Sequence, residues 1–123
     1  MHHKERIIVT CGEFDPLSYD ELLILQKCHL KGDWLIVGVH SDWWMMYARG
    51  GFMQSYETRR EIIKNIKVVD EVFSFNDSDG TVCQLLKIIK ICYPNAEIIY
   101  VSQEDMHNMP ETKIKGITFE TMR

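Results

Sequence analysis

The stretch GEFDPLSYDE, from Gly12 to Glu21, joins the apolar run IIVT to the helix-like sequence LLILQKCHL. A glycine-led turn between a buried strand and a helix is where α/β proteins commonly hold phosphate groups, because backbone N–H groups and the positive end of the helix dipole converge there. This turn, however, ends in Asp20 and Glu21. Two carboxylates at that place would repel a phosphate unless a cation lay between them.

The end of this stretch also has a purely structural interpretation. Ser18 and Glu21 have the spacing of a capping box, in which the serine oxygen accepts from the N–H of the third helical residue and the glutamate accepts from the N–H of the serine. Asp20 and Glu21 would also interact favourably with the positive end of the helix. The sequence therefore predicts a turn that is stable without a bound phosphate.

The elements that must position this turn alternate between strand and helix. Continuous apolar runs indicate strands covered on both faces, and i, i+3, i+4 spacing of apolar residues indicates helices. The expected strands are residues 6–10, 34–39, 71–75, 97–101 and 116–121, and the expected helices are residues 22–30, 58–66 and 81–92. This order predicts an α/β fold, a Rossmann-like five-stranded parallel sheet flanked by helices, with residues 12–18 at the carboxyl end of a central strand and a ligand crevice beside them.

One segment, from Ser41 to Glu57, fits neither pattern and is predicted to be a long loop. Between Trp43 and Met53 this segment carries seven large apolar side chains. Aromatic and methionine side chains are enriched at the centres of protein interfaces, and so many exposed on a monomer would form an unusually large patch. We expect the Trp43–Met53 loop to form a homodimer seam, with burial in the chain's own core as the alternative.

Composition limits the classes of function. The 123 residues, 46% of them apolar, suit a single domain spanning residues 1–123. A net charge of −4 without basic blocks disfavours binding to nucleic acid or anionic membranes, and no apolar run is long enough to span a bilayer. Because no signal-peptide pattern is present, a cytoplasmic location is expected. The four cysteines lack C-x-x-C spacing and lie in apolar patterns, so buried thiols are expected and no metal site.

The order of short motifs along the chain resembles that of the cytidylyltransferase family, and within it the glycerol-3-phosphate cytidylyltransferases. The family signature is Gly-x-Phe-Asp-x-x-His-x-Gly-His, and Gly12, Phe14 and Asp15 match its first part. The later motifs GD, HSD, SYETRR and VVDEV follow in the family's order over nearly the whole chain. The resemblance implies a nucleotidyltransferase fold, CTP or another nucleotide as ligand, Mg²⁺, and nucleotide contacts from Gly12, Phe14 and Asp15.

Two arginines are expected at the phosphates by this resemblance. Arg59 lies where the family has the arginine of its Tyr-x-x-Arg motif, which contacts the nucleotide or its phosphates. Its alternative is an ion pair with Glu57 or Glu61 at the start of a helix. Arg49 is the only cation in a span where the family carries several lysines, so it is expected to bind substrate or phosphate.

The departures from the family pattern concern the groups that would perform transfer. Ser18 and Glu21 stand at the catalytic positions, where the family has His-x-Gly-His and the histidines stabilise charge developing on phosphate. The family's closing Arg-Thr-x-Gly-Ile-Ser-Thr-Thr stretch follows its last strand, whereas this sequence stops at Arg123, just after GITFET. An alternative alignment places KIKGIT (residues 113–118) on that motif.

Three functions remain open: a divergent Mg²⁺-dependent nucleotidyltransferase acting on CTP and a small phosphorylated alcohol, a binding module that has lost transfer chemistry, and an interaction protein using the Trp43–Met53 loop. Because positive groups needed for transfer are missing, we place the last two ahead of the first. Among the histidines, His107 follows the fourth strand and is expected at the crevice as a substrate or phosphate contact. His29 and His40 are not expected to take part in chemistry.

Overall fold

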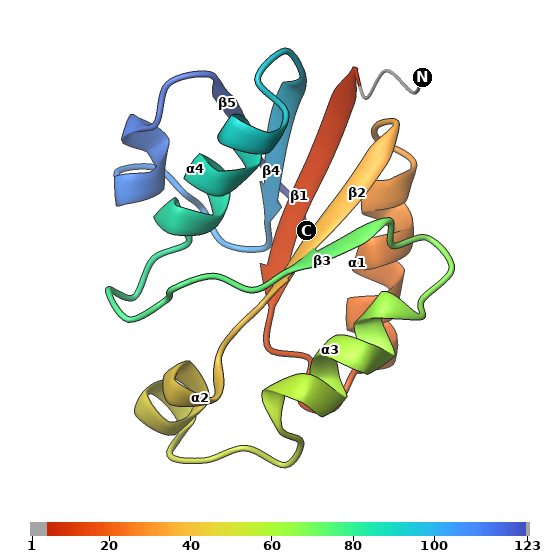
Figure 1. Ribbon diagram of the computed structural model, residues 1–123, viewed down its shortest axis with the longest axis vertical. Coiled ribbons are helices and arrows are strands. Elements are labelled where there is room, and N and C mark those ends of the chain that lie inside the picture. The colour runs from red at the N-terminus through yellow and green to blue at the C-terminus, as the bar shows by residue number, and fades with distance from the viewer. Residues whose placement is uncertain (1–4, 123) are drawn as a thin grey trace.

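The computed structural model describes residues 5–122 and contains one five-stranded sheet in which every pairing is parallel (Figure 1). The strand order is β3-β2-β1-β4-β5. The strands are β1 (Arg6–Gly12), β2 (Trp34–Val39), β3 (Glu71–Phe73), β4 (Glu97–Ser102) and β5 (Ile117–Thr121). The predicted five-stranded parallel α/β fold is therefore confirmed, with small differences at the strand ends.

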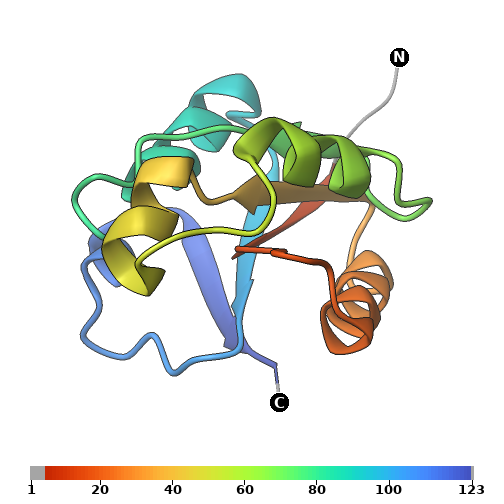
Figure 2. The ribbon, with the colours of Figure 1, turned by 90° about the horizontal axis from the view of Figure 1, so that it is seen from below.

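Helices cover both faces of the sheet, as Figure 2 shows from below. They are α1 (Tyr19–His29), α2 (Asp42–Arg49), α3 (Tyr56–Lys64), α4 (Cys83–Cys92) and the 3₁₀ helix η1 (Pro110–Lys113). Successive residues of a strand point to opposite faces, so β1 sends Ile8 to the core formed with α1 and α3 and Ile7 and Val9 to the core formed with α4. Burial on both faces explains the continuous apolar runs of the inner strands.

The central position of β1 determines where the chain leaves a crevice. β1 pairs with β2 on one side and with β4 on the other, so the connections that follow neighbouring strands diverge at the carboxyl ends of β1 and β4. Ligands of open α/β sheets bind at such a switch point. The turn from Gly12 to Ser18 lies there, as predicted, directly after the central strand.

The segment predicted to be a loop, Ser41 to Glu57, contains the helix α2, which was not predicted from the sequence. Ser41 is its N-cap, with a side-chain oxygen that accepts from the N–H of Trp44 at 3.0 Å, and Gly50 ends it in the left-handed conformation with φ of 77°. These are ordinary start and stop signals. The closely spaced large apolar residues obscured the helical pattern, because they lie on both the buried and the exposed side of this short helix.

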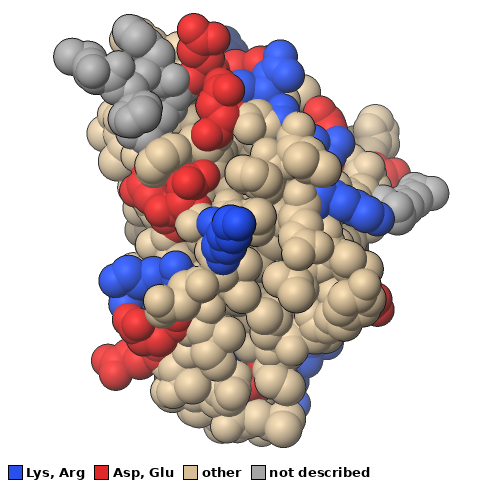
Figure 3. All heavy atoms as spheres, turned by 90° about the vertical axis from the view of Figure 1, so that its right-hand side faces the viewer, with Lys and Arg blue, Asp and Glu red and all other residues tan. Residues whose placement is uncertain are grey.

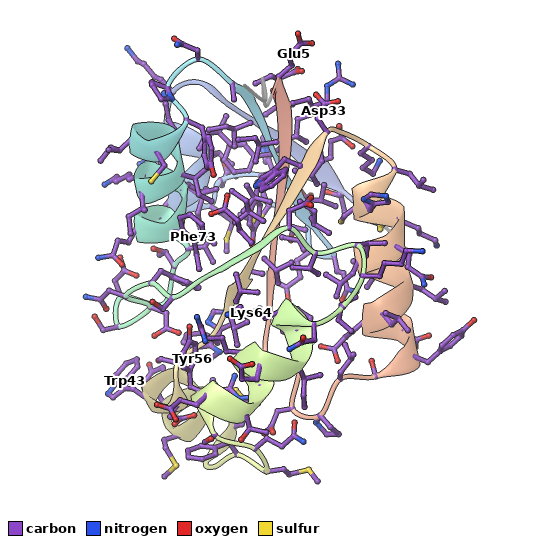
Figure 4. The ribbon with its side chains drawn as sticks, turned by 45° about the vertical axis from the view of Figure 1, so that its right-hand side comes forward. Glu5, Asp33, Trp43, Tyr56, Lys64 and Phe73 are labelled. Atoms are coloured by element: carbon purple, nitrogen blue, oxygen red, sulfur yellow. The ribbon has the colours of Figure 1, made fainter. Side chains whose placement is uncertain are left out.

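Apolar side chains of this region are divided between the two sides of α2. Met45 is buried, whereas Trp43 and Met46 are about half exposed and Tyr47 is 74% exposed. Figure 4 shows Trp43 at the outer edge of α2. The alternative of burial in the chain's own core thus holds for Met45 but not for the outward-facing residues.

The surface charges agree with the sequence-based prediction, whereas the burial of the cysteines agrees only in part. On the face drawn in Figure 3, Lys and Arg atoms lie scattered among Asp and Glu and form no continuous basic patch. Of the four cysteines predicted to be buried, Cys28 is buried, and Cys11 and Cys83 are partly buried. The prediction is wrong for Cys92, which is exposed in the last turn of α4, outside its buried apolar stripe. Among residues 5–122, no helix has the length and apolar character needed to cross a bilayer.

The capping box at the start of α1 is present as predicted. The Ser18 Oγ accepts from the N–H of Glu21 at 3.1 Å, and the Glu21 Oε1 accepts from the N–H of Ser18 at 2.9 Å. Two of the backbone donors that a helix start would offer to an anion are therefore already engaged.

Ser18→Ala should lower the free energy of unfolding by about 0.5–2 kcal/mol, because it removes the N-cap acceptor. Glu21→Gln should cost less, since an amide oxygen can still accept from Ser18 and only the charge–dipole interaction, about 0.3–1 kcal/mol, is lost. Urea denaturation of both variants measures the two effects. A larger loss for Glu21→Gln than for Ser18→Ala would contradict the capping interpretation.

Candidate functional site

A cavity of about 610 Å³ opens at the carboxyl ends of β1 and β4. Its volume lies in the range of small-molecule sites. The β1 end and the following turn supply residues 10–14, and the segment after β4 supplies residues 102–104. The other lining residues come from β4, α1, α2, η1 and the segments that precede α2, α4 and η1: Glu21, Ile24, Leu25, His40, Trp44, Arg49, Gly80, Val82, Tyr100, Met106, Met109 and Glu111. This cavity occupies the crevice that the sequence predicted.

Gly12 and Phe14 act together in the first turn of the cavity wall. A Cβ atom added to Gly12 would lie 2.7 Å from the Cζ atom of Phe14, closer than side chains tolerate. Phe14 has φ of 51° and a ring that is 95% buried in the core formed with α1. Phe14 therefore packs beneath the turn. The group that would lie nearest to a side chain at position 12 is the Phe14 ring, and the two would clash.

Asp15 is engaged by the backbone. Its two carboxylate oxygens accept from the N–H groups of Met53 and Gln54, both at 2.7 Å. These bonds tie the chain before α3 to the turn after β1. Asp15 does not line the cavity, so its role in this structure is to position the neighbouring segment.

Arg59 is completely buried, although it was expected to contact a nucleotide. Its guanidinium donates to three carbonyl oxygens, those of Glu13 at 3.0 Å, His40 at 2.8 Å and Gln54 at 2.9 Å. It also pairs with the Asp42 carboxylate at 2.9 Å. Both expectations for Arg59 need correction, because its ion pair is with Asp42 rather than Glu57 or Glu61 and the side chain has no surface in the cavity.

Arg49 does line the cavity, where it pairs with Glu13. Its Nη2 lies 2.9 Å from one carboxylate oxygen, and its Nε lies 3.0 Å from both oxygens. Arg49 is well exposed, so the pair is solvated and adds little stability, but it leaves the arginine with its charge compensated. Glu21 also lines the cavity, whereas Ser18 does not.

The histidine in the cavity wall is His40 and not His107. His107 is exposed in a turn and is absent from the cavity lining, because its neighbour Met106 points inward instead. His40 Nδ1 lies 3.0 Å from the Asp77 carboxylate, and its ring stacks on Trp44 with centroids 4.8 Å apart. The sequence signal that could have found His40 is its place directly after β2, at the carboxyl edge of the sheet.

Asp77 fixes the orientation of this imidazole. The Asp77 carboxylate is almost completely buried and accepts from the N–H of Ser41 at 2.8 Å and from its hydroxyl at 2.6 Å. Burial lowers the pKa of His40 more strongly than the bond to Asp77 raises it. Since an unperturbed histidine already has a pKa of about 6.5, His40 is neutral at pH 7 and adds no positive charge to the cavity.

Residues 9–120 match the family described as cytidylyltransferase-like. The chain belongs to this family. The glycerol-3-phosphate cytidylyltransferase of Bacillus subtilis (strain 168) is 32% identical to it over 65 residues, which are 53% of the chain and 50% of that protein. The bifunctional protein HldE of Pseudomonas syringae pv. syringae (strain B728a) is 36% identical over 90 residues, which are 72% of the chain and 19% of that protein. The predicted family resemblance is therefore confirmed.

Solved structures support the cytidylyltransferase-like fold. The lipopolysaccharide core biosynthesis protein from Thermoplasma volcanium GSS1 superposes with a TM-score of 0.71, at 22% identity over 95% of this chain and 93% of that one. A putative nicotinate-nucleotide adenylyltransferase from Vibrio parahaemolyticus gives a TM-score of 0.62, at 16% identity over 95% of this chain and 72% of that one.

The charge balance of this cytidylyltransferase-like cavity is negative. Its lining contains four carboxylates against the guanidinium of Arg49, and these are Glu13, Glu21, Glu104 and Glu111. Among residues 5–122, no group of three or more His, Cys, Asp or Glu side chains is arranged to hold a metal ion. An anionic ligand would therefore meet an unfavourable potential unless it brought its own cation.

Arg59→Met should lower the free energy of unfolding by about 3 kcal/mol or more. The variant keeps an unbranched stem but leaves the carbonyls of Glu13, His40 and Gln54 without this donor, and each buried unpaired acceptor costs about 1–3 kcal/mol. Urea denaturation measures the loss.

The matched control is Arg60→Met, because Arg60 is partly exposed and pairs with Glu61 at 3.2 Å. Its effect should stay within about 0.5 kcal/mol, as for most surface substitutions. Equal, small losses for both variants would show that the Arg59 bonds do not hold the loops together.

Proposed function

We propose that this cytidylyltransferase-like protein is a module that binds a ligand in its crevice and does not carry out the nucleotidyl transfer of its named relatives. The observation that supports this proposal is that the groups expected to face a triphosphate already interact with other parts of the protein. The capping box engages donors at the start of α1, Glu13 compensates Arg49, and Arg59 is buried among carbonyl groups. Each of these groups already has a partner within the protein.

The size of the expected defect follows from the electrostatics of transfer. Removing one donor that stabilises an oxyanion costs about 2.7–4 kcal/mol of barrier, or about 10²–10³ in rate. By the family resemblance, two histidines are replaced by Ser18 and Glu21. The serine is a single neutral donor outside the cavity lining, and the glutamate adds negative charge where positive charge is needed.

The second candidate function is Mg²⁺-dependent cytidylyl transfer from CTP to a small phosphorylated alcohol. Two observations favour it: Glu13 and Glu21 line the same cavity, and one relative is named glycerol-3-phosphate cytidylyltransferase. Since the described residues form no metal cluster of their own, Mg²⁺ would have to enter with the nucleotide. The binding-module proposal is preferred because it needs no such added cation.

A pyrophosphate-release assay with CTP, glycerol 3-phosphate and Mg²⁺ tests this choice. We expect turnover that is absent or at least ~10³-fold below that of the Bacillus subtilis relative assayed in parallel, as follows from the loss of more than one oxyanion stabiliser. Thermal unfolding with a panel of nucleotides and Mg²⁺ gives a second readout, since a ligand at 100 times its Kd stabilises by about 2.7 kcal/mol.

Robust turnover that Glu21→Gln abolishes would sink the binding-module proposal, because the carboxylate would then act on a nucleotide-bound cation. Asp20→Asn is the matched control, since Asp20 also lies in the first turn of α1 but does not line the cavity.

We further propose that the outer face of α2 and the following loop contact a second copy of the chain. This surface consists of Trp43, Met46, Tyr47, Phe52 and Met53, which are between 40% and 79% exposed. The rings of Trp43 and Tyr47 stack with centroids 5.2 Å apart and planes 5° from parallel, so the two side chains form one aromatic group on this surface. Aromatic and methionine-rich surfaces suit the centre of an isologous dimer.

Sedimentation velocity should therefore report a dimer, and Trp43→Asp should convert it to a monomer by placing a charge in the seam. Ile91→Asp is the control, because Ile91 is 78% exposed but lies on α4. A wild-type monomer at concentrations of ~100 µM would end the proposal, since an interface of standard size supports much tighter association.

A further inference from the structure

The buried carboxylate of Glu111 is not fully explained by the fold. Glu111 belongs to η1, is 97% buried and lines the cavity. Its Oε2 accepts from the N–H of Val82, the N-cap residue of α4, at 3.0 Å. Its Oε1, however, is buried without a hydrogen-bond partner. No protein group among residues 5–122 satisfies this oxygen, so its partner has to come from the contents of the cavity that Glu111 lines.

The surroundings of Glu111 exclude several partners for this oxygen. Arg49 also lines the cavity but pairs with Glu13, and His40 is neutral at pH 7. The remaining lining carboxylates, Glu21 and Glu104, add negative charge. The cavity thus presents an unpaired buried carboxylate in a negative potential, which favours a positively charged hydrogen-bond donor.

The chemistry of the walls favours an organic cation over a bare metal ion. Residues 5–122 contain no metal-ligand cluster of three or more side chains. Trp44 and Tyr100 line the same cavity, so its wall is partly aromatic, as in sites that hold organic cations. A volume of about 610 Å³ is also far larger than an ion needs and suits a small molecule.

We propose that the cavity binds a small organic cation, a protonated amine or guanidine, whose nitrogen donates to Oε1 of Glu111. This inference rests on the proposed function, because it names the ligand class of the same crevice. A ligand with a second cationic nitrogen would also be attracted by the carboxylates nearer the opening, Glu13, Glu21 and Glu104. Anionic ligands bind weakly for the same reason.

Isothermal titration with putrescine and with 1,4-butanediol tests the proposal, because the two probes match in length and differ in charge. We expect putrescine to bind and the diol to show no binding. The affinity for putrescine should fall as NaCl is raised from 50 to 500 mM, while a purely apolar site would respond little. Agmatine tests the guanidine form of the ligand in the same assay.

Glu111→Gln separates binding from folding. The amide oxygen can still accept from Val82, but the variant places an amide in the position of the charged oxygen, so putrescine should bind at least tenfold more weakly. Glu57→Gln is the matched control, since Glu57 is exposed on α3 outside the cavity, and its affinity should match that of the wild type. If Glu111→Gln fails to fold, Glu104→Gln takes its place, and its expected loss is smaller because Glu104 is exposed.

Equal binding of putrescine and the diol, binding of neither, or unchanged putrescine affinity in the Glu111→Gln variant overturns the inference. The pyrophosphate assay distinguishes a failure of this inference from a failure of the proposed function. No turnover together with no putrescine binding removes this inference alone, whereas robust turnover removes the proposed function whether or not putrescine binds.

Discussion

The buried guanidinium of Arg59 is the constraint on which the carboxyl edge of the sheet depends. It donates to the carbonyls of Glu13 after β1, His40 after β2 and Gln54 before α3, and it pairs with Asp42 in α2. Parallel strands are held to each other by ladder bonds, but the loops that leave their carboxyl ends share no such ladder. One planar side chain with five donors can satisfy several of these loops together, which a lysine could not do.

This arrangement also explains which parts of the site the sequence could predict. The strands and the capping box depend on local pattern, and Ser18 with Glu21 needs only a spacing of three residues. The partners of Arg59 come from loops up to 46 positions away, so neither they nor its burial could be inferred from the helix around it. The same holds for His40, whose partner Asp77 lies 37 positions further along the chain.

The helix α2 illustrates a different limit. Its caps, Ser41 and Gly50, were visible in the sequence, but Trp43, Met46 and Tyr47 are exposed, so its large apolar residues are not confined to the core side. Hydrophobic periodicity finds helices that bury one face in their own chain. A helix with large apolar residues on both sides does not show this periodicity and is predicted to be a loop. The failed prediction therefore indicates a helix whose solvent-facing side is unusually apolar.

Three separate features change the electrostatics of the crevice in the same direction. Glu21 reaches back to the N-cap at the positive end of α1, Glu13 compensates Arg49, and Arg59 is withdrawn into the protein. Any one of them could be a local stabilising device, since capping, surface pairing and loop bracing each have a structural benefit. Together they remove the positive potential that this fold offers at its switch point, while the cavity keeps its volume and its aromatic walls. The buried carboxylate of Glu111 accepts from the N–H of Val82 through one oxygen, so this bond at the start of α4 does not account for the other oxygen of the same cavity-lining residue. This cavity-lining carboxylate beside an open volume is the feature that links the two proposals, a binding module without transfer chemistry and a cationic ligand.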